Sequence, residues 1–271
     1  MNTPPSHVIG RIATVLRELS AAQSAGASTS DVARATALAR PTVHRVLTAL
    51  AEEGFVDRDP RSGRWYLGPE LYLLGEAAAK RYDVTAHARA GVHRLAATTG
   101  ESAFFSARRG DETVCLLRED GDFPLRSFVL YEGARFPLGV VSAGMVVLAM
   151  LPDRDIDNYL RQADLTENWG NGHAPEQVRR RIQETRQLGY AVNPGLVVEG
   201  SWGMAAAVFN RNGEPAWALS LTGVERRFGQ DRRPELGALL LKEAHALTRL
   251  LNARPPAQPL PNLSKVDSLP S

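Results

Sequence analysis

Residues 28–67, STSDVARATALARPTVHRVLTALAEEGFVDRDPRSGRWYL, decide the fold of the N-terminal part of the chain. Ser28 and Asp31 have the spacing of a capping box, which predicts that a short helix begins here. Pro41 suits the start of a second helix, because its missing N–H has no partner in a first helical turn. The apolar residues of this second helix recur at the spacing of one buried face, formed by Val43, Val46, Leu47 and Leu50.

A hairpin is predicted directly after the second helix. Phe55–Arg58 and Arg64–Leu67 have strand-like composition and flank a turn at residues 59–63. Helix, turn, helix and hairpin together predict a winged helix-turn-helix, whose second helix reads base edges while the wing contacts phosphates. The candidate DNA-contacting residues are Ser28, Arg40, Thr42, His44, Arg45, Arg58, Arg61 and Arg64.

The composition of the whole chain limits the class of protein. Its 271 residues suggest two domains, and 44% hydrophobic with 23% charged residues is ordinary for a globular protein. The net charge of +2 is small, so any binding to nucleic acid must come from a local patch. The lone Cys115 excludes an internal disulfide. Without a signal-peptide pattern or an apolar stretch of ~20 residues, we expect a cytoplasmic protein that has no membrane partner.

The order of predicted elements gives an α+β protein with four parts. Residues 1–68 form the winged-helix domain, 69–82 a linker helix, 83–253 a second domain and 254–271 a disordered Pro-rich tail. The second domain has a meander of strands, then helices on one side, then further strands, an arrangement of the size that holds a small ligand. Its predicted strands are Ser102–Ala107, Thr113–Glu119, Leu125–Leu130, Tyr190–Asn193, Met204–Asn210 and Ala216–Thr222.

No catalytic motif is present in the sequence. The chain has no nucleophile elbow, no P-loop, no dinucleotide-binding glycine motif and no zinc-protease motif. We therefore expect no enzymatic activity, no cofactor and no metal site, and we interpret Cys115 as a structural residue. Two alternatives stay open: a metabolite-binding protein or enzyme that carries a winged-helix interaction module, and a protein-interaction adaptor.

Four stretches resemble the IclR family of bacterial transcription regulators. They are residues 40–47, 54–68, 135–149 and 189–223. The resemblance implies a winged helix-turn-helix, a linker helix and a GAF-like α+β effector-binding domain. It also implies a homodimer or tetramer that binds a palindromic operator in double-stranded DNA, and a small effector that alters this binding. Repression is our working interpretation, although the sequence does not distinguish a repressor from an activator.

The resemblance also implies where the effector binds, and this chain departs from the family there. Many members have an acidic residue at the position of Asn193 and Arg-Cys at Trp202-Gly203. Asn is neutral and Trp is a large apolar group, so we expect an effector with a larger apolar body, such as an aromatic acid. The alternative is that Phe136 and Trp202 only fill the core. The candidate effector-binding residues are Phe136, Ser142, Ala143, Asn193, Trp202, Gly203, Ser220 and Thr222.

Overall fold

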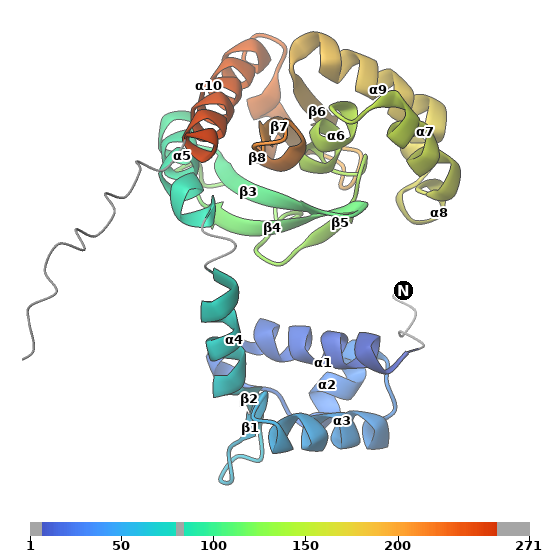
Figure 1. Cartoon of the computed structure of the whole chain (residues 1–271), viewed down its shortest axis with the longest axis vertical. Helices are drawn as coiled ribbons and strands as arrows, with labels where there is room; N and C mark the ends of the chain where they lie inside the picture. Colours follow the sequence, from blue (N-terminus) through green and yellow to red (C-terminus); the bar gives the residue numbers. More distant parts are fainter. Residues whose placement is uncertain (1–6, 80–83, 254–271) are drawn as a thin grey trace, which may run out of the picture. The chain divides into compact units, whose positions relative to one another are not determined.

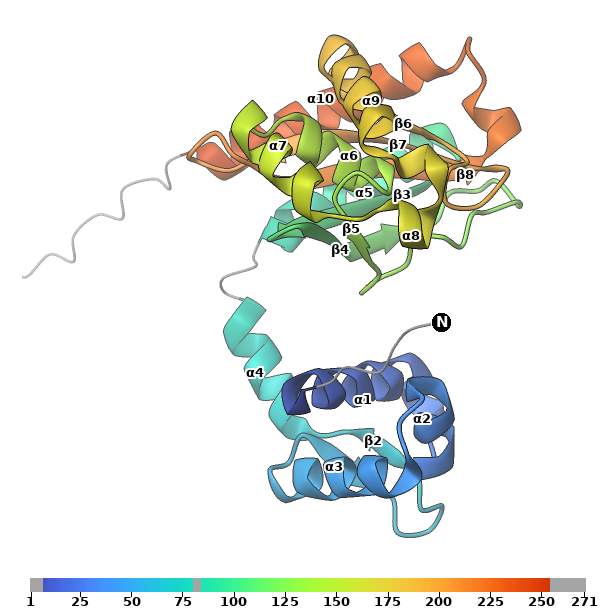
Figure 2. The same cartoon turned by 90° about the vertical axis from the view of Figure 1, so that its right-hand side faces the viewer.

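The computed structural model describes residues 7–79 and 84–253, which fall into two compact units divided between residues 83 and 84 (Figures 1 and 2). The end of the predicted linker helix (80–82) and the predicted Pro-rich tail (254–271) lie outside the described residues.

The first unit is a winged helix-turn-helix, as the sequence predicts. Helix α1 (Val8–Ala22) is followed by the short 3-10 helix η1 (Gln23–Ala25), α2 (Thr29–Thr36) and α3 (Arg40–Glu52). The wing is the antiparallel pair β1 (Val56–Arg58) and β2 (Trp65–Leu67). The three helices and the wing enclose one small core, formed by Val15, Leu19, Ala27, Val32, Val43, Leu47, Leu50, Val56 and Trp65.

Local signals set the helix ends of this unit. The predicted capping box is present: the Asp31 N–H donates to Ser28 Oγ (3.1 Å) and the Ser28 N–H donates to Asp31 Oδ2 (3.2 Å). Ala37 is the C-cap of helix α2, and its φ of 53° is left-handed and rare for a residue with a side chain. Helix α3 begins at Arg40, so Pro41 is its second residue, and Gly54 (φ 73°) turns the chain after it.

Helix α4 (Pro69–Ala79) follows the wing and covers most of the predicted linker helix. It is apolar but poorly covered within its own chain: Tyr72, Leu73 and Leu74 are 69%, 58% and 49% exposed. Exposed apolar side chains of this kind are typical of surfaces that bind a partner.

The second unit is built on a six-stranded sheet whose neighbouring strands are all antiparallel. The strand order is β5-β4-β3-β8-β7-β6. Its strands are β3 (Ser102–Arg109), β4 (Glu112–Glu119), β5 (Arg135–Pro137), β6 (Tyr190–Pro194), β7 (Ser201–Phe209) and β8 (Pro215–Val224). The helices are α5 (Val84–Thr99), α6 (Ser142–Ala149), α7 (Asp153–Gln162), α8 (Thr166–Trp169), α9 (Pro175–Leu188) and α10 (Arg233–Asn252), with the 3-10 helices η2 (Asn171–His173) and η3 (Glu225–Phe228).

Helices cover both faces of this sheet, so the expectation of helices on one side is wrong (Figure 1). α5 and α10 pack on one face, and α6 with α7 and α9 lies on the other. The reason is visible in β3, where Phe104 belongs to one core and its neighbour Phe105 to the other. Because successive side chains of a strand point to opposite faces, a strand apolar throughout needs cover on both.

The predicted strand Leu125–Leu130 is also wrong. Residues 120–134 have no helix or strand, and the edge strand that pairs with β4 is β5 instead. Leu130 is buried in the core below α6, so packing decides this segment rather than strand propensity. We call residues 120–134 the 120–134 loop.

Cys115, membrane-spanning helices and metal-binding clusters are also the subject of sequence-based expectations. Cys115 lies buried in β4, and burial raises the pKa of its thiol to about 12, as suits a structural cysteine. Within the described ranges, no helix is long and apolar enough to cross a membrane. Across those same ranges, no three His, Cys, Asp or Glu side chains gather in a way that would hold a metal ion.

Candidate nucleic-acid interface and ligand pocket

The outward face of α3 presents unpaired polar side chains. Val43, Leu47 and Leu50 are buried, which leaves Arg40, His44 and Arg45 exposed, while Thr42 is half-buried. Arg40, His44 and Arg45 form no hydrogen bond or ion pair with the residues that the structure describes. Their donors are therefore free to meet phosphates or base edges.

The arginines of the wing differ from one another. Arg61 is exposed at the turn, which Asp59 holds by accepting the N–H groups of Arg61 (2.9 Å) and Ser62 (3.3 Å). The Ser62 hydroxyl donates to Asp59 as well and is the main cause of the lowered pKa of this carboxyl. Arg61 thus projects from a preformed turn with its guanidinium unpaired.

Arg58, Arg64 and Ser28 have structural partners in this unit. The Arg58 guanidinium lies over the Trp65 ring at 5.5 Å, and Arg64 Nη1 donates to the Gly26 carbonyl oxygen (2.9 Å). The Ser28 hydroxyl donates to Asp31 Oδ2 (2.7 Å) within the capping box. These three residues hold the wing and α2 in place, so Arg40, His44, Arg45 and Arg61 are the stronger candidates for DNA contact.

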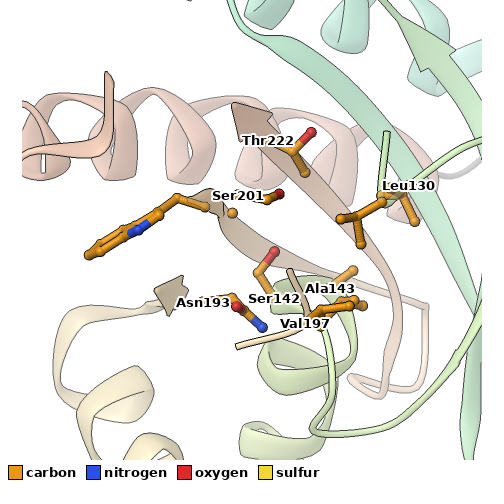
Figure 3. Close-up of a pocket in the computed structure, with 11 residues that line it drawn as sticks. Leu130, Ser142, Ala143, Asn193, Val197, Ser201 and Thr222 are labelled. Atoms are coloured by element: carbon orange, nitrogen blue, oxygen red, sulfur yellow. The ribbon is translucent and has the colours of Figure 1, made fainter. Parts of the chain in front are cut away.

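In the second unit, six of the eight candidate effector residues line one pocket between β7, β8 and the start of α6 (Figure 3). They are Ser142, Ala143, Asn193, Trp202, Gly203 and Thr222. Phe136 does not line it: it packs in the core against Trp169, with ring centroids 5.4 Å apart. Ser220 does not line the pocket either: it is fully buried, on the same strand as Thr222.

Two features give the pocket polar groups. Val141 is the N-cap of α6, so the pocket meets a helix N-terminus whose first N–H groups have no partner within the helix. The Thr222 hydroxyl is buried and has no hydrogen-bond partner among the described residues. Both can satisfy an acid or hydroxyl group of a ligand, and the helix N-terminus favours negative charge.

The Asn193 side chain already forms two hydrogen bonds within the protein. Its Nδ2 donates to the Val140 carbonyl oxygen (2.7 Å), and its Oδ1 accepts the Leu196 N–H (3.0 Å). The side chain therefore ties the start of α6 to the turn after β6. Asn193 shapes the pocket wall, and one amide N–H is left to meet a ligand.

Gly203 and Trp202 face opposite sides of the sheet. A Cβ on Gly203 would lie 3.0 Å from Ser142 Oγ, so glycine permits the close approach of α6 to β7. The neighbouring Trp202 packs with the core of the other face, and Arg233 lies over its ring at 5.1 Å. Its indole is thus held on the α10 side of the sheet, although the residue also borders the pocket.

Five lining residues were not predicted from the sequence: Val129, Leu130, Val141, Val197 and Ser201. Three of them (Val129, Leu130 and Val197) come from irregular segments, which carry no periodic signal. Ser201 also holds the 120–134 loop, because its hydroxyl lies 2.6 Å from the Ser127 hydroxyl. The cavity has a volume of about 30 Å³, room for about two water molecules.

A winged helix-turn-helix followed by a sheet domain with a small pocket is the composition of a DNA-binding regulator with a ligand-binding domain, and known proteins agree. The model of the IclR helix-turn-helix domain matches residues 8–60, and that of the bacterial transcriptional regulator IclR C-terminal domain matches residues 76–249. The glycerol operon regulatory protein of Streptomyces coelicolor is 30% identical over 227 residues, which cover 83% of this chain and 88% of that protein.

Solved structures show the same fold. The IclR transcriptional regulator of Alicyclobacillus acidocaldarius has a TM-score of 0.72 at 28% identity, covering 89% of this chain and 96% of that one. An IclR homologue of Microbacterium hydrocarbonoxydans, solved in complex with 4-hydroxybenzoate, has a TM-score of 0.70 at 21% identity, covering 90% and 100%.

The chain belongs to the IclR family. It is a DNA-binding transcription regulator with a C-terminal effector-binding domain, and not an enzyme.

Proposed function

We propose that this regulator binds a palindromic operator as a dimer and that a small organic acid, in the favoured case an aromatic one, alters this binding. The exposed, unpaired Arg40, His44 and Arg45 on α3 carry the DNA-reading part of the proposal. Placed in the major groove, α3 would offer two guanidinium groups for guanine or phosphate and two further side chains, His44 and Thr42, for base edges. Arg61 on the wing would meet a phosphate.

The proposed effector class follows from the pocket. Its walls are mostly apolar, and its free polar groups include the N–H groups at the start of α6, the Ser142 and Thr222 hydroxyls and one Asn193 amide N–H. An apolar body with an acid group matches this set. The 4-hydroxybenzoate bound by the Microbacterium homologue is an acid of this kind and is the first probe to use.

The proposed dimer rests on exposed apolar surface in the first unit. Tyr72, Leu73 and Leu74 of α4 and Val8 and Ile9 of α1 are each about half exposed or more. Exposed apolar side chains that gather on one surface mark interaction sites. We expect a second copy of the chain to cover this surface. A two-fold symmetric operator has two half-sites, and a dimer places its two recognition helices about one helical turn of DNA apart.

Binding of the full-length protein to the DNA upstream of its own gene tests the proposal. Fluorescence anisotropy at two salt concentrations, with non-specific competitor, should give specific binding that weakens steeply with salt through counterion release. Addition of 4-hydroxybenzoate or benzoate should then change the affinity, by a coupling of about 1–3 kcal/mol. If the non-specific competitor removes the bound protein at both salt concentrations, the protein does not recognise a specific sequence in this DNA.

A further inference from the structure

Arg181 on α9 is a buried cation that forms no ion pair with a carboxylate of the described residues. The residue is 8% exposed, and its Nη2 donates to the Gly172 carbonyl oxygen (3.0 Å). Its Nε and Nη1 are also buried but have no hydrogen-bond partner among the described residues. These two atoms carry three of the five N–H donors of a guanidinium group. Burial lowers the pKa of Arg181 to about 10, so the group is still charged at neutral pH.

The carboxylate nearest in sequence, that of Glu184, opposes the lowering of the Arg181 pKa but forms no ion pair with Arg181. Glu184, on the same helix, is exposed and lies 3.9 Å from the exposed Arg180. A buried charge is costly unless it is paired, and buried polar groups without partners are rare in folded proteins. An unpaired guanidinium at this depth therefore points to a partner that is not part of the described chain.

On the side of Gly172, uncharged residues connect Arg181 to the pocket. Gly172 packs closely on Leu196, since a Cβ there would lie 3.1 Å from Leu196 Cδ2. The Leu196 N–H in turn donates to Asn193, which lines the pocket. Arg181 is thus separated from the pocket by the turn that contains Leu196 and Val197.

His173 completes the neutral wall beside Arg181. It is buried, and its ring nitrogens lie near the carbonyl oxygens of Trp169 (Nδ1, 2.8 Å) and Val140 (Nε2, 3.3 Å). Burial lowers its pKa, and the charge of Arg181 lowers it further. The residues that line the pocket are also uncharged. No carboxylate of the described chain therefore competes for Arg181 from these two sides.

We propose that Arg181 forms a buried anion site beside the effector pocket and that this site takes a carboxylate group. A carboxylate offers two oxygen acceptors to the three free N–H donors, in the geometry that guanidinium binds best. The carboxylate belongs either to a free small acid or to the effector itself, reaching Arg181 past Val197. The second source rests on the proposed function, whereas the first does not.

Thermal unfolding of the full-length protein tests the site without an effector. At pH 7 and constant ionic strength, sodium acetate should raise the Tm of the wild type saturably, by about 5 °C when acetate far exceeds its Kd. Arg181→Met should show no saturable rise and should start from a higher Tm than the wild type without acetate, because the unpaired charge is gone. Arg180→Met, an exposed arginine on the same helix, is the matched control and should respond like the wild type.

Two results would overturn the proposal. One is that acetate raises the Tm of the wild type no more than it raises the Tm of Arg181→Met. The other is an Arg181→Met protein that is less stable than the wild type without acetate, which would make Arg181 a structural residue that needs no anion.

A second measurement distinguishes the two sources of the carboxylate. Calorimetry compares 4-hydroxybenzoate with its uncharged amide, 4-hydroxybenzamide. If the effector's own acid group occupies the site, the wild type should bind the acid at least tenfold more tightly than the amide, and Arg181→Met should lose this preference. If a free acid occupies it, both proteins should bind the two compounds alike. Absence of binding by both compounds would count against the proposed effector class, while the acetate experiment would still decide the role of Arg181.

Discussion

The hydrogen bond between Ser127 and Ser201 fastens the 120–134 loop over the pocket, and Ser201→Ala removes that bond. The hydroxyl oxygens are 2.6 Å apart, and Val129 and Leu130 of the loop form one wall of the cavity. A groove of about 900 Å³ borders this contact and shares Val129 and Ser201 with the pocket. The cavity of about 30 Å³ is far too small for an aromatic acid. We therefore expect the loop to open before such a ligand enters.

The magnitude follows from the single bond that is lost. A neutral hydrogen bond contributes about 1 kcal/mol net, so Ser201→Ala should raise the population of the open loop about fivefold. If the loop closes again over the bound ligand, the hydrogen bond between Ser127 and Ser201 is present in the wild type both with and without ligand. Ser201→Ala then destabilises the ligand-free and the ligand-bound closed states equally. Association and dissociation rates of 4-hydroxybenzoate should then both rise about fivefold while the Kd stays constant.

Stopped-flow tryptophan fluorescence measures these rates. Ser62→Ala, which removes a serine hydroxyl bonded to Asp59 in the wing, is the matched control and should leave them unchanged. An unchanged association rate with a weaker Kd would refute the reasoning, because Ser201 would then contact the ligand rather than hold the loop.

A disulfide across the same contact should have the opposite effect. In Ser127→Cys/Ser201→Cys, oxidation should slow association at least a hundredfold and reduction should restore it. The native Cys115 will not interfere, because it is buried and its thiol pKa is raised to about 12. Normal association in the oxidised protein would exclude this loop as the route of entry.

Three further predictions concern DNA binding and stability. Arg45→Ala should cost about 1–3 kcal/mol of specific operator binding, whereas Arg61→Ala should lower the slope of log K against log salt by about one; anisotropy titrations would contradict this if both variants bound like the wild type. Ala37→Gly should stabilise the first unit by about 0.5–1 kcal/mol, because glycine tolerates the φ of 53° at the end of α2, and a lower calorimetric Tm would contradict it. Burial lowers the folded-state pKa of His173 below its ordinary 6.5, so the unfolded chain binds the proton first as pH falls. The stability that this difference contributes is present above pH 6.5 and lost below it, and His173→Asn should flatten urea-unfolding stability between pH 7.5 and 5.

The winged helix was predictable because its signals are local. The capping box at Ser28, the buried stripe of α3 and the arginine-rich turn of the wing each act within a few residues, and the structure has all three. Which arginines are free was not predictable. Arg64 and Gly26 are far apart in the sequence, and only the folded chain shows that the Arg64 guanidinium donates to the Gly26 carbonyl oxygen.

The sheet domain was less predictable because its strand pairs are long-range. Residues 125–130 have the composition of a strand, but β4 pairs with Arg135–Pro137 instead. Alternation along β7 also decides that Gly203 faces α6 and that Trp202 faces α10. From the sequence alone, Trp202 and Gly203 are assigned together to the effector site, because the strand register that places them on opposite faces of the sheet is known only from the structure.

Arg181 shows that a buried functional group can leave a signal in the sequence. Val178, Arg181, Ile182 and Thr185 follow the i, i+3, i+4, i+7 spacing, and all four are buried. The neighbouring Arg179 and Arg180 fall outside this stripe and are exposed. A charged residue on the apolar stripe of a helix conflicts with the pattern around it, and such conflicts are expected where a site needs the charge. The position of one arginine among three is therefore the sequence feature that points to an anion partner.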